Sequence, residues 1–244
     1  MSDWLFAACA LVAAGLVQGL SGFGSGLVSM SLLPLIWPVS FSVAISAVYS
    51  LFISCTLAWQ LRAHLRLRDI LIPIAAALCC VPIGARLLAS VDSTVAMGGL
   101  GVLLTVYSVW NLVRPKRPTT HMSRRWGAGA GVASGLLTGA LNTGGPPIVA
   151  WIGAQPWTKD EMKGTLQVFF IPSSVVAITT YAFSGVVSSD TLRWNLQLAP
   201  ALAGGLWLGT KLYSRVPQEG FRRVLLIGLL IVGVRYVAGA WLKL

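Results

Sequence analysis

The chain has 244 residues, of which 56% are hydrophobic and 10% are charged, and its mean hydropathy is +0.77. Because an average soluble domain carries roughly 25% charged residues, this composition excludes a water-soluble protein. Divided into apolar stretches of ~20 residues, the length that crosses a bilayer core, the chain has room for about eight membrane segments. We therefore expect an all-α integral membrane protein.

The formal net charge is +11. In a soluble protein such an excess would suggest a nucleic-acid partner, but no basic stretch accompanies a soluble fold here, so we expect no nucleic acid. Basic residues in a membrane protein are instead typical of cytoplasmic loops. The four cysteines lie in apolar runs without a CxxC pattern, which indicates neither a metal site nor a disulfide. They are Cys9, Cys55, Cys79 and Cys80.

The first half of the chain, residues 1–113, begins with an apolar stretch from 4 to 37 that is interrupted by SGFGSG at 21–26. Glycines disfavour a continuous helix, so this stretch is predicted to be a broken membrane segment. No Lys or Arg precedes it, and we therefore do not expect a cleaved secretory signal. Three segments of crossing length follow, at about 40–61, 70–89 and 94–113.

Residues 114–125 read RPKRPTTHMSRR, with five basic residues and two prolines. This composition predicts a solvated basic linker on the cytoplasmic side. The second half, residues 126–244, opens with another apolar stretch, which runs to residue 155 and is split by NTGGPP at 142–147. Segments at about 164–184, 192–213 and 221–242 follow. The layout of the first half therefore recurs.

Sliding the chain on itself by 120 positions superposes glycines of the two halves. Gly15, Gly19 and Gly24 fall on Gly135, Gly139 and Gly144. After a slip of five positions, GARL at 84–87 meets GTKL at 209–212, which aligns Arg86 with Lys211. These matches predict an internal duplication.

The connection after the second segment holds three arginines between 62 and 68, whereas its counterpart at 185–190 holds no Lys or Arg, and the next connection shows the reverse. If basic loops face the cytoplasm, equivalent loops lie on opposite sides of the membrane. We therefore predict two inverted repeats, each a broken helical hairpin followed by three transmembrane helices, with both termini outside. Eight simple crossings with parallel repeats are the alternative, which would place Lys159 and Lys163 outside.

The seven Asp and Glu residues all fall at predicted connections or segment ends, and both histidines lie in basic linkers. Cation pumps and proton relays usually keep such groups within the helix bundle, so a cation transporter is disfavoured. No HExxH or GxSxG pattern occurs. We expect no enzyme, no cofactor and no metal.

The two breaks favour an anion instead. A half-helix that begins inside the bilayer directs unpaired backbone N–H groups and the positive end of its dipole at whatever lies there. Proline suits the first turn of such a helix. Two half-helices that meet near the midplane would form a neutral but electropositive cradle for one anion. The candidate substrate-binding residues are Gln18, Ser21, Gly22, Phe23, Gly24, Ser25, Gly26, Thr138, Asn142, Thr143, Gly144, Gly145, Pro146 and Pro147.

Three basic residues, Arg86, Lys163 and Lys211, are candidates for attracting the anion. The alternative is that their side chains extend from helix ends to the membrane interface. The glycines upstream of the breaks are interpreted as helix-packing positions, because small residues let membrane helices approach closely. They are Gly15, Gly19, Gly135 and Gly139.

The motif GLVQGLSGFGSG at 15–26, with Pro34 downstream, and GLLTGALNTGGPPIV at 135–149 resemble the sulfite exporter TauE/SafE family of membrane anion permeases. The resemblance covers the whole chain, and GGPP at 144–147 is its most specific element. The first motif has Ser25 where the family often has a further glycine. The resemblance implies transport of sulfur-containing anions such as sulfite, thiosulfate or organosulfonates like sulfoacetate, and a multi-pass protein of a bacterial inner membrane.

Export is the expected direction, because an inside-negative potential drives an anion outward. A transporter of another small organic or inorganic anion and a non-transporting membrane scaffold are the alternatives. The expected partners are a small anionic substrate and the lipid bilayer. The sequence leaves the coupling ion, channel or carrier kinetics and the oligomeric state open, a homodimer included.

Overall fold

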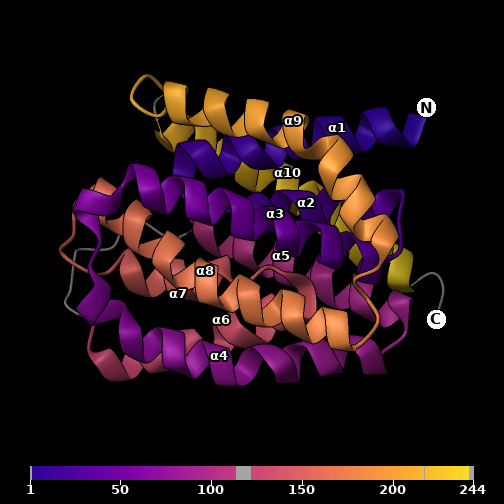
Figure 1. Ribbon diagram of the computed structural model, residues 1–244, viewed down its shortest axis with the longest axis horizontal. Helices are drawn as coiled ribbons and strands as arrows, with labels where there is room; N and C mark the ends of the chain where they lie inside the picture. Colours follow the sequence, from indigo (N-terminus) through magenta and orange to yellow (C-terminus); the bar gives the residue numbers. More distant parts are fainter. Residues whose placement is uncertain (1, 114–121, 217, 242–244) are drawn as a thin grey trace.

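The structure is a computed structural model that describes residues 2–113, 122–216 and 218–241. The described residues of the first half form α1 (Ser2–Ser21), α2 (Ser25–Leu32), η1 (Leu33–Leu35), α3 (Val39–Gln60), η2 (Arg62–His64), α4 (Leu67–Ser90) and α5 (Ser93–Val113). Those of the second half form α6 (Arg124–Leu141), α7 (Gly145–Ile152), α8 (Lys159–Phe183), α9 (Ser189–Leu212) and α10 (Gln218–Trp241). The helices run side by side along the long axis of the molecule (Figure 1).

Six helices are long and apolar enough to cross a membrane, namely α1, α3, α4, α5, α8 and α10. The prediction of an all-α membrane protein is confirmed. One predicted crossing, 192–213, differs. It lies in α9, a continuous helix of 24 residues that is not among the six. The first turns of α9 contain polar residues such as Asp190, Arg193 and Asn195, which make it less apolar than the others.

The two predicted breaks are present, and each divides its stretch into a long helix and a helix of eight residues. In the first break Gly22 and Gly24 have φ values of 81° and 103°, and in the second Asn142 has a φ of 51°. Glycine adopts this left-handed region freely, and asparagine does so more readily than most other residues. The long helix of the first stretch, α1, has the length of a full crossing.

At the glycines the backbones of α1 and α9, and those of α6 and α4, are in contact. This confirms their interpretation as packing positions. A Cβ on Gly19 would lie 2.8 Å from the carbonyl oxygen of Leu206, and one on Gly139 would overlap the carbonyl oxygen of Val81. Leu206 and Val81 are 125 positions apart, the same offset that aligns Gly209 with Gly84. The contact that α1 makes with α9 therefore recurs, at equivalent positions of the repeat, as the contact that α6 makes with α4.

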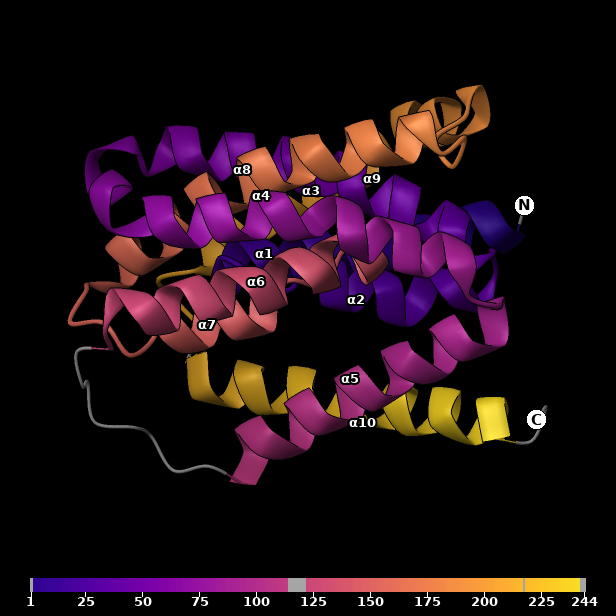
Figure 2. The ribbon, with the colours of Figure 1, turned by 90° about the horizontal axis from the view of Figure 1, so that it is seen from below.

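Equivalent helices of the two halves thus exchange partners: α1 packs on α9, and α6 packs on α4. In Figures 1 and 2 both chain termini lie at the right-hand end, where α1 begins, whereas α6 begins at the left-hand end. This arrangement supports two copies of one unit in opposite orientation. The inverted relation itself, and the division at 113 and 126, stay predictions. Most of the linker, 114–121, lies outside the described residues.

The basic connections of the chain meet at one end of the molecule. Three contacts join them: Arg66 with Glu161, Arg124 with Asp69 (3.9 Å), and the hydroxyl of Tyr213 with a carboxylate oxygen of Asp160 (3.1 Å). The connection around Lys159 therefore lies at the same end as the arginines of 62–68. The charge pattern places these connections on one side in the inverted arrangement.

Candidate functional site

The two helix breaks touch each other. The first turn of α2 lies so close to the second break that a Cβ on Gly26 would overlap the carbonyl oxygen of Asn142. Only glycine permits this approach of two backbones. The starts of the two short helices, α2 and α7, are therefore brought to one place by residues that are far apart in the sequence.

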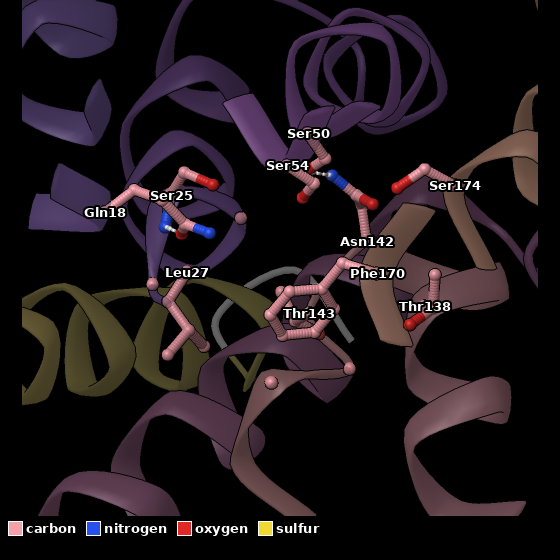
Figure 3. Close-up of a pocket in the computed structure, with 14 residues that line it drawn as sticks. Gln18, Ser25, Leu27, Ser50, Ser54, Thr138, Asn142, Thr143, Phe170 and Ser174 are labelled. Carbon is pink, nitrogen blue, oxygen red and sulfur yellow. Dashed lines mark hydrogen bonds between the residues drawn. The ribbon is translucent and has the colours of Figure 1, made fainter. Parts of the chain in front are cut away.

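A cavity of ≈ 30 Å³ lies at this meeting point (Figure 3). A volume of this order admits a few water-sized atoms, so the walls must separate further before a larger anion can enter. The lining comes from α1, α2, α3, α6, α7 and α8. It consists of Gln18, Gly24, Ser25, Gly26, Leu27, Ser50, Ser54, Thr138, Asn142, Thr143, Gly144, Gly145, Phe170 and Ser174.

Most of the lining is made of pairs of positions that are 120 residues apart, the offset of the internal repeat. The cavity therefore lies where equivalent residues of the two halves converge. These pairs are Gln18 with Thr138, Gly24 with Gly144, Ser25 with Gly145, Ser50 with Phe170, and Ser54 with Ser174.

Every lining side chain is uncharged, and the helix starts supply backbone donors. The amides in the first turn of a helix have no acceptor within the helix. In α2 the amide of Ser25 donates to the side-chain oxygen of Gln18 (2.9 Å), while Gly26 and Leu27 follow in the same turn. In α7 two prolines lack an N–H, and the amide of Ile148 donates to Ser134 (3.1 Å). The backbone amides of Gly144 and Gly145 are therefore the remaining donors at this helix start.

Two hydroxyl groups of the lining, Ser54 Oγ and Thr143 Oγ1, are buried and have no hydrogen-bond partner within the described residues. Each residue is only 1% exposed. A buried polar atom without a partner is destabilising by about 1–3 kcal/mol, and such atoms are uncommon in native proteins. Both hydroxyls come from the cavity wall, so a ligand or water in the cavity would satisfy them.

Asn142 connects the second break to α3. Its side-chain nitrogen donates to the hydroxyl of Ser50 (3.0 Å), as Figure 3 shows, and to that of Ser46 (2.8 Å). The Ser46 hydroxyl in turn lies 2.6 Å from that of Ser29 in α2. The carboxamide therefore holds the second break, α3 and the first short helix in one hydrogen-bonded chain. Its position is determined by this chain as well as by the left-handed backbone.

Two glutamines secure the first break. The side-chain nitrogen of Gln167 donates to the carbonyl oxygen of Gly22 (2.6 Å), and that of Gln18 donates to the side-chain oxygen of Gln167 (3.3 Å). Both side chains are buried. The carbonyl groups exposed by the break are thus satisfied without water, as a membrane interior requires.

A family model described as sulfite exporter TauE/SafE matches residues 6–236, nearly the whole chain. The chain belongs to the TauE/SafE family. No curated protein and no solved structure matches it significantly. TauE/SafE membership confirms the resemblance of the two break motifs, and it makes this chain a multi-pass membrane transporter of anions such as sulfite.

Five of the predicted residues of this TauE/SafE protein do not line the cavity. Ser21 donates to the carbonyl oxygen of Phe23 (2.5 Å) within the break, and Gly22 accepts from the two glutamines. Phe23 packs against two apolar clusters. Pro146 and Pro147 form the first turn of α7, where proline was expected. These residues shape the breaks, and a role in binding stays a prediction.

The three candidate cations lie in different surroundings. Arg86 and Lys211 are exposed near the ends of α4 and α9, and the Lys211 ammonium lies 4.7 Å from the centre of the Trp207 ring. Lys163 is 5% exposed and donates to the carbonyl oxygen of Gly19 (2.5 Å) at the end of α1. None of the three is in the lining, but Lys163 lies against the first break, where its side chain contacts Gly22.

Sequence reasoning missed the TauE/SafE cavity residues of α3 and α8, and Leu27 of α2. A repeat offset of 120 aligns Ser54 with Ser174, so the signal was present in the sequence. Serines are common in membrane helices, and nothing in the local sequence distinguishes those that face a cavity from those that face a neighbouring helix. The missed residues are Leu27, Ser50, Ser54, Phe170 and Ser174.

Proposed function

We propose that the cavity between the two breaks binds a sulfur-containing anion, such as sulfite or an organosulfonate like sulfoacetate, and that the chain exports it. The observation that carries this proposal is the lining: neutral donors from both repeats, together with two buried hydroxyls that lack a partner among the described residues. A group with three oxygens can accept several backbone and hydroxyl hydrogen bonds at once.

An anion suits this cavity better than a cation does. The positive ends of two helix dipoles, those of α2 and α7, are directed at it. Its lining holds no carboxylate, the group that a cation site in a membrane usually contains. Phe170 adds one apolar surface, against which the carbon tail of an organosulfonate would rest.

The sulfur specificity rests on the TauE/SafE family alone. A transporter of another small anion would use the same donors. A membrane scaffold without transport is disfavoured by the neutral donors that both repeats direct at one cavity, because a scaffold has no use for such a lining.

The direction of transport follows from charge. If the end that gathers the basic connections faces the cytoplasm, an anion is attracted there and is driven outward by about 2.3 kcal/mol per charge for each 100 mV of inside-negative potential. Both termini would then lie outside. The location in a bacterial inner membrane rests on the TauE/SafE family and not on the charge.

The test is a thermal-unfolding titration of the detergent-purified protein with sulfite, thiosulfate, sulfoacetate, sulfate and chloride. A ligand that binds only the folded state stabilises it by about 2.7 kcal/mol at a hundred times its Kd. We expect selective stabilisation by a sulfite or sulfonate. A folded protein that none of these anions stabilises would contradict the substrate class.

Lys163 is the buried cation nearest to the first break, and we propose that it attracts the anion toward the cavity. The Lys163→Met change removes the charge but keeps the length of the side chain. We expect it to raise the Kd of the anion about tenfold, the effect of ~1.4 kcal/mol. The measurement is the same titration, and its control is Lys159→Met, at an exposed position one turn earlier on α8. If both changes weaken binding equally, or if neither weakens it, Lys163 does not attract the anion and only satisfies a carbonyl group at the end of α1.

A further inference from the structure

A second and larger cavity has a volume of ≈ 210 Å³. Its walls come from the start of α3, the end of α4, the start of α5 and the end of α8, and these helix ends lie opposite to the basic connections (Figure 1). We call it the outer vestibule. Its lining is Val39, Ser40, Ala85, Leu88, Ala89, Val91, Ser93, Ala96, Tyr181, Ser184 and Val186.

Helix α8 connects the two cavities. Ser174 lines the central cavity and Tyr181 lines the outer vestibule. The two residues are two helical turns apart, a distance of about 10 Å along the helix axis. The separation between the cavities is therefore short.

Tyr181 lies in the stretch of α8 between the two cavities. Its hydroxyl donates to the carbonyl oxygen of Gly139 (2.5 Å) at the end of α6 and lies 3.1 Å from that of Thr138, which lines the central cavity. Tyr181 is 1% exposed. One aromatic side chain thus has its ring at the vestibule and its hydroxyl on the backbone that forms the wall of the central cavity.

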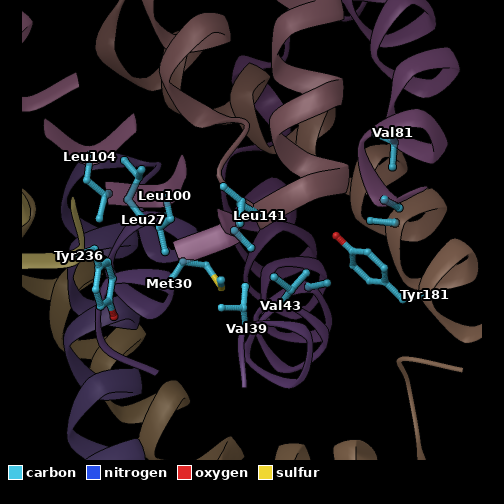
Figure 4. Packing of buried hydrophobic residues seen from close by; sticks show 14 of the residues in the cluster. Leu27, Met30, Val39, Val43, Val81, Leu100, Leu104, Leu141, Tyr181 and Tyr236 are labelled. Atoms are coloured by element: carbon cyan, nitrogen blue, oxygen red, sulfur yellow. The ribbon is translucent and has the colours of Figure 1, made fainter. Parts of the chain in front are cut away.

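Tyr181 belongs to a buried apolar cluster that also contains Val43, Ala47, Leu141 and Ala177, and part of this cluster is drawn in Figure 4. This cluster contains a lining residue of the central cavity, Leu27, and lining residues of the outer vestibule, Val39 and Ala96, so apolar groups lie between the two cavities. Apolar groups of this kind exclude water and ions until they move apart.

We propose that Tyr181 is the outer gate of the anion path and that the outer vestibule is the route by which the anion leaves. This inference rests on the proposed transport function. When the Tyr181 hydroxyl releases the end of α6 and the ring turns into the vestibule, the central cavity opens to the outside. The Thr138 carbonyl keeps the amide of Asn142 as a donor (2.9 Å) when this happens. The freed phenol hydroxyl then donates to the passing anion.

The test measures access to the central cavity from outside. Ser174→Cys is introduced into a protein whose four native cysteines are replaced by alanine, and intact cells are treated with a methanethiosulfonate reagent that carries a sulfonate group. We expect slow labelling with Tyr181 in place, labelling at least tenfold faster with Tyr181→Ala, and an intermediate rate with Tyr181→Phe, which loses only the hydroxyl. The Tyr236→Phe variant is the control, because Tyr236 also donates from the buried cluster to a backbone carbonyl, that of Ser31 (2.8 Å), but lies in neither cavity lining.

Each outcome is decisive for the gate. Equal labelling rates in Tyr181→Ala and its parent, with both proteins folded by size-exclusion chromatography, would overturn it, as would acceleration by Tyr236→Phe to the same extent. The labelling does not depend on the natural substrate. Faster labelling in a protein that binds no sulfur anion would therefore keep the gate and reject the substrate, whereas anion binding with unchanged labelling would reject the gate alone.

Discussion

The Asn142→Asp variant is expected to lose anion binding almost completely. Aspartate has the same shape as asparagine and also tolerates the left-handed backbone found here, with its φ of 51°. The change removes the side-chain N–H groups that Ser46 and Ser50 accept, and it places a negative charge in the wall of the cavity. Two like charges about 4 Å apart repel by about 4 kcal/mol at an effective dielectric constant of 20, which corresponds to roughly a thousandfold in Kd.

The measurement is the thermal-unfolding titration with the anion that binds the unchanged protein. Lowering the pH neutralises the new carboxylate and is expected to restore part of the affinity. The control is Asn142→Gly, which keeps the backbone conformation and adds no charge. It should weaken binding far less than aspartate does, because it removes only the neutral hydrogen bonds to Ser46 and Ser50. Asn142→Leu is less informative, because a bulky residue is strained at a positive φ. Unaltered affinity in Asn142→Asp would remove this residue from the site.

The Gly139→Ala variant is expected to produce the largest loss of stability among single glycine changes in α6. The new Cβ would overlap the carbonyl oxygen of Val81 and lie 2.8 Å from the amide nitrogen of Ala85, so α4 and α6 must move apart. Overpacking of a close interface typically destabilises by about 1–3 kcal/mol, and backbone atoms cannot yield as a flexible side chain does. We expect a loss near the upper end of this range.

The check is the thermal midpoint of the purified proteins in one detergent. Gly129→Ala is the matched control, because it lies in the same helix and a Cβ there meets nothing within 4 Å. Alanine favours a helix over glycine by about 1 kcal/mol, so this variant should be as stable as the parent or slightly more so. Gly19→Ala, whose Cβ would lie 2.8 Å from its nearest neighbours, should be intermediate. A Gly139→Ala protein as stable as Gly129→Ala would contradict the close packing of α4 on α6.

The positions of the two helix breaks could be predicted from local sequence. Clustered glycines, with the asparagine and prolines of the second motif, cannot continue a helix, and the structure breaks at those positions. Nine of the fourteen candidate binding residues then line the central cavity. The other five act on the shape of the break instead, and this distinction depends on which way each group points once the helices have packed.

The polar side chains of α3 and α8 illustrate the opposite case. Ser54 and Ser174 lie in largely apolar stretches, as many serines of membrane helices do, and only the approach of six helices turns them into a cavity wall. Lys163 was one of three candidate cations with equal support from the sequence. Its burial, and its bond to Gly19, which is 144 positions away, distinguish it from Arg86 and Lys211.

By itself the sequence determined that this protein lies in a membrane, where its helices break, which glycines allow close packing and which family it resembles. Each of these properties depends on the composition or backbone preferences of a few neighbouring residues. The tertiary structure alone decided that Gly26 meets Asn142, that the hydroxyls of Ser54 and Thr143 lie in the wall of one cavity, and that Tyr181 bonds to the end of α6. Those contacts join residues far apart in the chain, because the packing of whole helices, rather than any local preference, brings them together.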